Sequence, residues 1–421
     1  MQYFFILGRN PELSLAELHA LLPEKYTLTA FFREVAIIEC AELDIAPFMC
    51  RLGGTIKIGE IIAHNPSQPP RFPAKPDPPR AERGGDEQIP PLKVRGGRGS
   101  YESFSREILQ SLHSFRITEK NDKKLFLGLS AYTLDPKVRL PSVRELRELG
   151  IAVKRALQKQ EYKVRLVTSK EIALSSVIVK REKLLTQGAE IILFHADDGI
   201  SLGKTLAVQE FAEASARDFG RPERSMGVGM LPVQLTKIML NLARAPIDAT
   251  ILDPFCGLGT VLTEAAQMGY QNLIGSDMER NMIDATRGNL EWIAKQNKLF
   301  SYSRELETNN IHLLTTAVEN LSSHIPPHSV DAIVTEPYMG PTTGIKNEEL
   351  RMKNELEKLY IAAFREFSKI LKPAGRVVFI LPAFKHGTQL AKTSDRVLPE
   401  IKKLGFSPTL LLPNNLRTYL P

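Results

Sequence analysis

Short apolar runs alternate with amphipathic stretches along most of the chain. In the first part, apolar runs at 3–8, 31–40 and 55–64 predict β-strands, and the stretches between them predict two helices. So regular an alternation over a short length is typical of a small ferredoxin-like α/β domain, which we assign to residues 1–65.

This pattern stops between residues 66 and 99, where proline, glycine and charged residues replace the apolar ones. Such a segment has too little apolar surface to offset its chain entropy, so we expect a flexible insertion or linker. The alternation returns afterwards. It predicts a second α/β domain at 100–200, a linker at 201–230 and a third domain at 231–421.

The third domain has the most regular pattern. Between residues 249 and 383, short apolar runs are separated by amphipathic stretches and turns. Strands that alternate with helices predict a mainly parallel, doubly wound sheet of the Rossmann-like α/β class, in which ligands bind at the carboxyl ends of the strands. The apolar residues at 404–413 and 416–421 are expected to form a final hairpin.

Composition limits the kind of protein that the chain forms. At 421 residues it is too long for one compact core, and its hydrophobic content of 43% is ordinary for a globular protein. Cys40, Cys50 and Cys256 match neither a disulfide framework nor a zinc site, so a reducing cytoplasm and no metal are expected. The chain shows no basic leader and no apolar stretch of membrane-spanning length, so we expect neither a signal peptide nor a membrane partner.

Charge adds a candidate partner. The formal net charge is +7 at pH 7, and the isoelectric point is near 9.1, which suits a polyanion. Basic residues gather in the second domain, with Lys154 and Arg155 on one expected helix and Lys180 and Arg181 further along. Such a run forms either a solvated face or a contact surface for RNA, and both interpretations stay open.

A strand–turn–helix–strand unit at 249–277 carries the first candidate chemistry. Gly257 and Gly259 let the backbone turn sharply and let a ligand approach bare peptide groups. The carboxylate of Asp277, at the end of the second strand, is placed to accept hydrogen bonds from a ribose diol. Because the turn lacks the third glycine of a dinucleotide site and the lysine of a phosphate loop, a cofactor with ribose and no pyrophosphate fits better. S-adenosylmethionine is such a cofactor, with Asp253 accepting from its ammonium group; a turn of purely structural use is the alternative.

The second candidate stretch is Thr335-Glu336-Pro337-Tyr338, at the end of a later strand. The exocyclic amine of a nucleobase is a poor nucleophile, because its lone pair is delocalised into the ring, so it needs hydrogen-bond acceptors as charge develops. A carboxylate and proline-held backbone carbonyls would supply them, and Tyr338 offers a stacking face. A simple turn with a packed tyrosine is the alternative.

Together these motifs resemble a known family. DPFCGLGT, GSDM and TEPY are similar to the motifs of Rossmann-like amino-methyltransferases, and the segment before the first strand, 217–243, resembles THUMP-containing tRNA guanosine-N2 methyltransferases. The resemblance implies a ferredoxin-like domain, a THUMP domain at about 101–198 that grips the acceptor end of tRNA, and a catalytic domain. It also implies S-adenosylmethionine as cofactor, tRNA as partner, and the N2 amine of a guanosine as target, with guanosine 10 as a candidate position.

Site residues follow from the motifs and the resemblance. The expected catalytic residues are Glu336, Thr335 and Tyr338. The expected cofactor-binding residues are Met230, Leu231, Asp253, Phe255, Gly257, Gly259, Thr260, Asp277, Met278, Thr316 and Ala317. The expected RNA-binding residues are Lys154, Arg155, Lys180 and Arg181.

Two departures from the family pattern bear on these roles. The acidic or amide residue of the family falls on Thr335, and its first proline falls on Glu336, so either Glu336 takes over the acceptor role or backbone carbonyls hold the amine. After the third strand the usual adenine-reading acid is replaced by Thr315-Thr316-Ala317, so that contact is assigned to backbone or Thr316.

Two other functions stay open. One is a methyltransferase with a different target, such as another RNA base, a DNA base or a protein amine. The other is a catalytically silent tRNA-binding protein with the same fold. The sequence alone defines neither the modified nucleotide nor a partner subunit.

Overall fold

A computed structural model of the chain describes residues 1–23, 25–65, 124–224, 230–296, 310–340, 349–386 and 389–413, together with 108, 110 and 416. The predicted insertion at 66–99 lies outside these residues. The chain forms two compact units. Unit 1 comprises residues 1–7, 25–45 and 56–209, and unit 2 comprises residues 8–24, 46–55 and 210–421.

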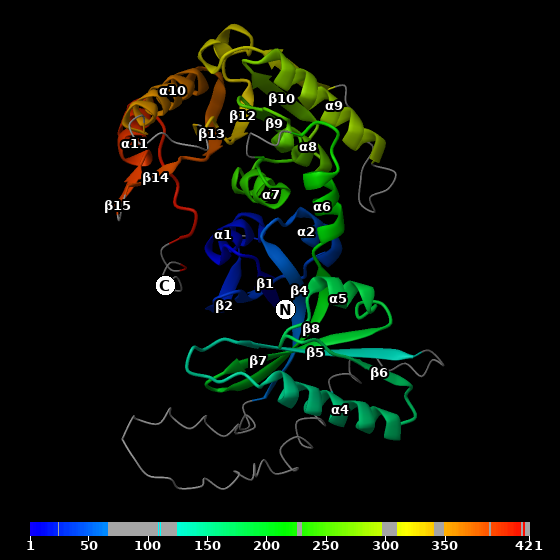
Figure 1. The fold of residues 1–421 in the computed structure, drawn as a ribbon. Coiled ribbons are helices and arrows are strands. Elements are labelled where there is room, and N and C mark those ends of the chain that lie inside the picture. The colour runs from blue at the N-terminus through cyan, green and yellow to red at the C-terminus, as the bar shows by residue number, and fades with distance from the viewer. Residues whose placement is uncertain are drawn as a thin grey trace, which may run out of the picture. The chain divides into compact units, whose positions relative to one another are not determined.

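Unit 1 is built on one eight-stranded sheet with the strand order β2-β3-β1-β4-β8-β7-β5-β6 (Figure 1). Its strands are β1 Gln2–Leu7, β2 Tyr26–Phe32, β3 Val35–Cys40, β4 Thr55–Asn65, β5 Leu125–Thr133, β6 Val164–Val167, β7 Gly188–Ala196 and β8 Gly199–Val208. Antiparallel pairing of β4 with β8 joins the strands of the first two predicted domains into this sheet.

Three predictions are corrected in this sheet. The strands of residues 1–65 and 100–200, expected in separate domains, share one sheet because β4 pairs with β8. The expected linker at 201–230 contains strand β8 and helix α6, Phe211–Phe219. The single strand expected at 31–40 is the turn and second arm of a hairpin, because the chain reverses at Arg33, whose φ is 49°.

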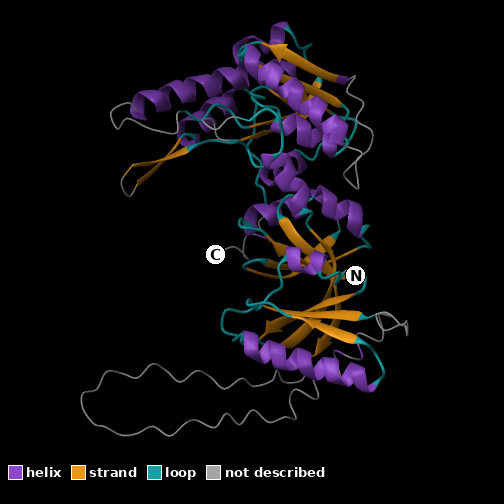
Figure 2. Ribbon diagram, turned by 45° about the vertical axis from the view of Figure 1, so that its right-hand side comes forward, coloured by secondary structure: helices purple, strands orange, loops and turns teal. Residues whose placement is uncertain are grey.

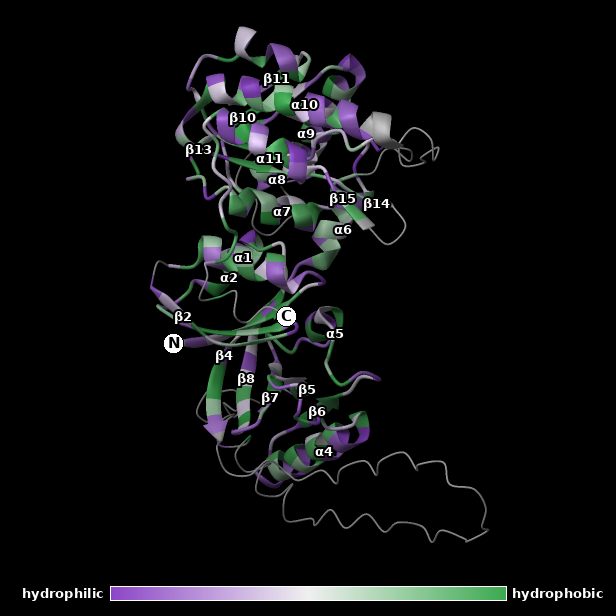
Figure 3. Cartoon of the chain, turned by 90° about the vertical axis from the view of Figure 1, so that its left-hand side faces the viewer, coloured by the Kyte–Doolittle hydropathy of each residue, from purple (hydrophilic) through white to green (hydrophobic). Residues whose placement is uncertain are grey.

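Two helices cover opposite faces of this sheet. Helix α4, Val143–Lys159, begins at a capping box between Ser142 and Glu145 and packs on Leu127 and Leu129 of β5. Helix α5, Ser176–Arg181, belongs to a second cluster that includes Phe126. Alternate residues of a strand point to opposite faces, so α4 and α5 lie on different sides of the sheet, as Figure 1 shows. Hydrophobic and hydrophilic residues alternate along α4 (Figure 3).

A buried ion pair links four strands of unit 1. Lys57 of β4 donates to Glu190 of β7 at 2.5 Å, and both side chains are almost fully buried. The hydroxyls of Ser130 and Thr205 also donate to the Glu190 carboxylate, each at 2.6 Å. Lys57 further donates to the carbonyl oxygen of Leu174. Because each buried charge has close partners, the cluster fixes the register of the strands that it joins.

Unit 2 contains a five-stranded parallel sheet with the order β11-β10-β9-β12-β13. Its strands are β9 Thr250–Asp253, β10 Asn272–Asp277, β11 Ile311–Thr315, β12 Val330–Thr335 and β13 Leu371–Phe379. Its principal helices are α7 Val233–Leu242, α8 Thr260–Gln267, α9 Arg280–Gln296, η2 Val318–Ser323, α10 Glu349–Ile370 and α11 Ser394–Lys403. This arrangement confirms the predicted doubly wound, mainly parallel α/β fold.

Helices cover both faces of the parallel sheet (Figure 2). Ile251 and Ala332 belong to the core shared with α7, α8 and α9. Leu252 and Ile333, their neighbours along the strands, belong to the core shared with α10, α11 and η2. Strands buried on both faces explain the uninterrupted apolar runs in the sequence.

The first two helices of the chain belong to unit 2. They are α1, Pro11–Leu21, and α2, Ile45–Arg51. The buried Glu17 carboxylate accepts from the backbone amides of Gly53 and Gly54, each at 2.8 Å, and from the Asn241 amide of α7 at 2.7 Å. Lys237 of α7 donates to the carbonyl oxygen of Cys50 at 2.8 Å. These bonds hold α1 and α2 against α7.

The end of the chain differs from the prediction. The described hairpin is β14, Ala383–His386, with β15, Gln389–Lys392, whereas 404–413 contains no strand. Pro408 and Pro413 lack amide hydrogens, which disfavours the expected hairpin there. Among the described residues β13 is therefore an edge strand.

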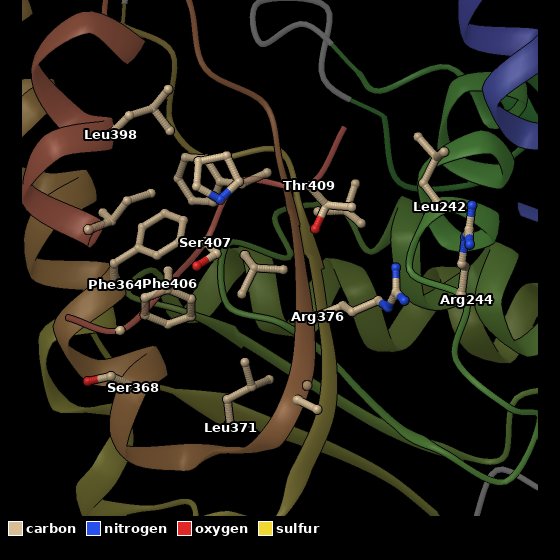
Figure 4. A pocket seen from close by; sticks show the side chains of 18 of the residues that line it. Leu242, Arg244, Phe364, Ser368, Leu371, Arg376, Leu398, Phe406, Ser407 and Thr409 are labelled. Atoms are coloured by element: carbon tan, nitrogen blue, oxygen red, sulfur yellow. The ribbon is translucent and has the colours of Figure 1, made fainter. Parts of the chain in front are cut away.

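Beside β13 lies a cavity of about 740 Å³, with Phe364, Phe406 and Leu398 on one side and Arg244 and Arg376 on the other (Figure 4).

Among the described residues, no helix is both long enough and apolar enough to cross a membrane.

Candidate active site

The centre of the parallel sheet of unit 2 is a topological switch point. Strands β9 and β12 are neighbours there, and the chain proceeds from β9 toward β10 on one side and from β12 toward β13 on the other. Ligands of doubly wound sheets bind outside the carboxyl ends of the strands at such a point. The two strands end at Asp253 and Thr335, so the structure brings both predicted motifs to one place.

Asp253 and Thr335 contact one another directly. The Thr335 hydroxyl donates to Oδ1 of Asp253 at 2.6 Å, and the Phe255 amide donates to the same atom at 3.2 Å. Burial raises the pKa of Asp253 to about 7; the two donated hydrogen bonds lower it, and the nearby Asp277 and Glu336 raise it further. Asp253 is 2% exposed and Thr335 is fully buried, so both side chains lie beneath the protein surface at the switch point.

The glycine loop follows β9 directly. Gly257 and Gly259 have φ values of 49° and 78°, in the left-handed region that favours glycine. Thr286 of α9 donates to the carbonyl oxygen of Gly257 at 2.7 Å, and Asn289 of the same helix donates to that of Leu258 at 2.9 Å. The loop is therefore held from α9. Sequence reasoning missed Thr286 and Asn289, because nothing local to them shows which loop they contact.

Asp277 lies beside this loop. Its carboxylate accepts from the Gly257 amide at 3.1 Å and from the Glu279 amide at 2.9 Å, and it is half-buried. Burial raises the pKa of Asp277, while the bonds from Glu279 and Gly257 lower it. Each carboxylate oxygen carries two lone pairs, so both retain capacity for ligand hydroxyls.

Other predicted cofactor residues have mixed positions. Met278 is 74% exposed beside Asp277. The Thr260 hydroxyl accepts from the buried Arg221 guanidinium at 2.7 Å, and Leu231 packs in the core beneath the sheet. Thr316 is buried, and its amide donates to the Asp277 carbonyl oxygen at 3.0 Å. Met230, Phe255 and Ala317 are half-buried. Thr260 and Leu231 thus have structural partners that the sequence did not reveal.

The turn after β12 presents its side chains unequally. Thr335 and Pro337 are buried, Glu336 is half-buried, and Tyr338 is 57% exposed. Burial raises the pKa of Glu336. Tyr360 of α10, another residue that sequence reasoning missed, donates its hydroxyl to the Tyr338 carbonyl oxygen at 2.7 Å and so fixes the turn.

The four predicted RNA-binding residues do not form one cluster. Lys154 and Arg155 lie on α4, and Lys180 and Arg181 lie on α5, across the sheet of unit 1. Arg181 pairs with Glu182 at 3.3 Å. The sequence shows which helix carries a charge, whereas the face that a helix covers depends on the strands beneath it.

Comparison with known proteins places this site in a class. A family profile described as an RMKL-like methyltransferase domain matches residues 222–403. The tRNA (guanine(10)-N2)-dimethyltransferase of Methanocaldococcus jannaschii is 33% identical over 153 residues, which cover 36% of this chain and 38% of that protein. The U6 snRNA (guanine-N(2))-methyltransferase THUMPD2 of Bos taurus is 28% identical over 149 residues, covering 35% and 25%. Unit 2 therefore contains a methyltransferase domain.

The particular family follows from a further relative. The probable tRNA (guanine(10)-N2)-dimethyltransferase of Methanothermococcus thermolithotrophicus is 30% identical over 146 residues, which cover 35% of this chain and 78% of that protein. The chain belongs to the family of THUMP-containing guanine-N2 RNA methyltransferases, as its motifs predicted. Its alignments span between 32% and 47% of the length of the first three archaeal relatives.

The methyl donor of this class is S-adenosylmethionine, and the switch point fits it. A Cβ added at Gly257 would meet only the Phe255 carbonyl oxygen, at 4.0 Å, so the space above the loop is open. At Gly259 the same atom would lie 2.7 Å from Thr286, so that side of the loop is closed by protein. The Asp277 carboxylate and the exposed Met278 border the open side. Asp277 would hold the ribose diol, and Met278 would offer apolar surface to the adenine ring.

Proposed function

We propose that this protein methylates the exocyclic N2 amine of a guanosine in tRNA, with S-adenosylmethionine as methyl donor, and acts in the cytoplasm. Relatives named for guanine N2 methylation of tRNA and of U6 snRNA support the base and the atom. The basic balance of the chain supports an RNA partner. The predicted THUMP domain at 100–200 would contribute to RNA binding.

One observation carries the proposal most strongly. Glu336 is half-buried at the carboxyl end of β12, and no described residue donates a hydrogen bond to its carboxylate. Thr335 and Pro337, on either side of it, are buried. Tyr338, two residues further, is exposed. A desolvated carboxylate next to an exposed aromatic ring is suited to a stacked nucleobase whose amine needs an acceptor.

The chemistry then divides among the residues of the site. S-adenosylmethionine supplies a sulfonium methyl group when it is bound. Glu336 accepts a hydrogen bond from the target amine and so localises the nitrogen lone pair as the reaction begins. With this donor bound, the amine nitrogen would take the methyl group, and the electron pair of the carbon–sulfur bond would stay with sulfur. The proton that the nitrogen loses passes to the Glu336 carboxylate, whose raised pKa makes it a better base.

Thr335 takes a different part in this assignment. Its hydroxyl is donated to Asp253, and its side chain is fully buried. It is therefore a positioning residue, which holds the start of the turn, and Glu336 takes the acceptor role. The burial of Thr335 and its bond to Asp253 support Glu336 as the acceptor, one of the two alternatives that the sequence leaves open.

The test is methylation of unmodified tRNA transcripts with labelled S-adenosylmethionine, followed by mass spectrometry of the nucleosides. We expect N2-methylguanosine. Glu336→Gln should lower the single-turnover rate about a hundredfold or more while leaving cofactor affinity nearly unchanged, because a preorganised acceptor acts mainly in the transition state. Calorimetry measures the cofactor affinity.

Glu291→Gln on α9, a change of the same type at an exposed position, is the matched control and should leave the rate unchanged. Methyl groups found on a DNA base or on protein instead of RNA would contradict the proposed substrate. RNA binding without methylation of any transcript would indicate a silent RNA-binding protein.

A further inference from the structure

The turn after β12 contains one side chain that is both open to a base and able only to accept hydrogen bonds. Thr335 is fully buried and donates to Asp253, and Pro337 is buried and has no amide hydrogen. Tyr338 is exposed, and its backbone is held by the hydroxyl of Tyr360, which donates to the Tyr338 carbonyl oxygen. Glu336 is left as the polar group that a base stacked on Tyr338 would meet at its edge.

Stacking alone does not select a base. Every nucleobase has an aromatic face, so a tyrosine ring accepts all of them with similar free energy. The buried Asp253 and Thr335 hydrogen-bond one another, so their side chains are occupied. Selection at this turn must therefore come from the edge of the base and from the group that faces it.

The chemistry of a carboxylate favours one edge. An ionised carboxylate has two acceptor oxygens and no donor. The Watson–Crick edge of guanine presents two adjacent donors, the N1 hydrogen and the N2 amine. Adenine and cytosine present an amine beside a ring nitrogen that is itself an acceptor, so the second oxygen would face a lone pair. Uracil has a ring N–H but no amine.

We propose that Glu336 is the base-selecting residue of this enzyme, and that its two carboxylate oxygens accept from N1–H and N2–H of one guanine. This inference rests on the proposed function, because it names how that reaction chooses its base. It assigns one side chain two tasks, recognition before the transfer and proton acceptance during it. It also explains why a carboxylate can stand where related motifs carry proline, since the preceding position, Thr335, is turned toward Asp253.

A change in the hydrogen-bonding edge of the substrate base tests the assignment. 2-Aminopurine carries the same exocyclic amine as guanine, but it lacks O6 and has an acceptor at N1 in place of the N–H; the loss of O6 is common to every protein variant compared. The analogue is introduced at the methylated position of an otherwise identical RNA. The wild-type protein should prefer guanosine by about a hundredfold or more in kcat/KM, because a site built for two donors rejects an analogue that lacks one of them.

The variant Glu336→Gln should change that ratio. A glutamine amide has one acceptor and one donor group, so it can accept from the amine of 2-aminopurine and donate to its N1. We expect the preference for guanosine to shrink to within about tenfold or to reverse, with both rates lower than in the wild type. Glu336→Asp keeps two acceptors and should keep the preference at reduced rate. Glu291→Gln should change nothing.

A second measurement does not depend on turnover. The fluorescence of 2-aminopurine reports its insertion against an aromatic ring, and competition with the guanosine RNA gives the ratio of the two affinities. This ratio should fall in Glu336→Gln and not in Glu336→Asp. If wild-type protein discriminates and Glu336→Gln discriminates equally in both assays, the inference is wrong and the proposed function stands. If wild-type protein methylates no RNA guanosine, the proposed function itself fails and the inference fails with it.

Discussion

At the scale of single residues, the candidate site contains a buried carboxylate, that of Asp253, whose surroundings disfavour its charged form. Asp253 is 2% exposed, and burial raises its pKa to about 7. Its ordinary value is near 3.8, so the folded state holds a proton that the unfolded chain has already lost between these two pH values. Such a group destabilises the fold when it ionises. Active sites commonly carry groups of this kind, because function requires them.

This predicts how stability depends on pH. Below about pH 4 Asp253 is protonated in both states, and its effect is small. As the pH rises from about 4 to about 7 the wild-type protein should lose up to about 4 kcal/mol of unfolding free energy relative to Asp253→Asn, which cannot ionise, and roughly two-thirds of this loss falls above pH 5. The single tryptophan, Trp292, lies in unit 2 and reports urea unfolding by fluorescence at pH 5 and pH 8. Equal differences between the two proteins at both pH values would contradict the raised pKa.

At the scale of elements, the sheet of unit 1 decides which charges act together. Helices α4 and α5 pack on opposite faces, so their basic residues point into different solvent regions. The arginine and lysine residues of each helix therefore belong to separate surfaces. An RNA helix held on one face makes its phosphate contacts with that face, since these contacts need side chains within reach of the backbone.

We accordingly expect one pair of charge reversals to matter and the other to be silent. Lys154→Glu with Arg155→Glu changes α4, and Lys180→Glu with Arg181→Glu changes α5. The charge reversal on the face that contacts RNA should lower tRNA affinity. It should also reduce the slope of log K against log salt by up to about two, because two counterion-releasing contacts are lost. Filter binding between low and moderate salt measures the slope. Equal losses from both pairs would show that RNA wraps both faces.

At the scale of the whole molecule, residues from the first part of the chain complete unit 2. Glu17 of α1 accepts three hydrogen bonds, two from the backbone amides of Gly53 and Gly54 and one from Asn241 of α7. Burial raises the pKa of Glu17, and these donors lower it. All three partners are donors, so the site requires a group that only accepts. The methyltransferase unit is therefore built from three separate stretches of sequence.

This arrangement predicts a specific loss of stability. Glu17→Gln retains size and shape, but its amide hydrogens would face the Gly53 or Gly54 amide. We expect the unfolding free energy of unit 2 to fall by about 2–4 kcal/mol, the scale of a buried donor left without its acceptor. Trp292 fluorescence again follows the transition. Glu12→Gln, on the exposed side of the same helix, is the control and should be nearly neutral. A variant as stable as the wild type would show that α1 contributes little to unit 2.

The sequence by itself determined the fold class, the family and the β9–α8–β10 unit with its glycine loop and Asp277. These features are local: strand, turn and helix follow one another, and hydrophobic periodicity together with glycine and acid positions describes them. The roles of the individual site residues remain predictions. The order of strands and helices along the chain was also predicted from the sequence. The exceptions are the hairpin turn at Arg33 and the strand at 199–208, which lack a clear local signal.

Only the tertiary structure decided what depends on distant pairing. The Thr335–Asp253 bond joins residues 82 apart, which no local pattern shows. The pairing of β4 with β8 joins the predicted first two domains, and α1 and α2 join unit 2 instead. Such contacts follow from strand order and from which face each helix buries, and neither is encoded in local propensity, because each requires the shapes of segments far apart in the chain to be fixed together.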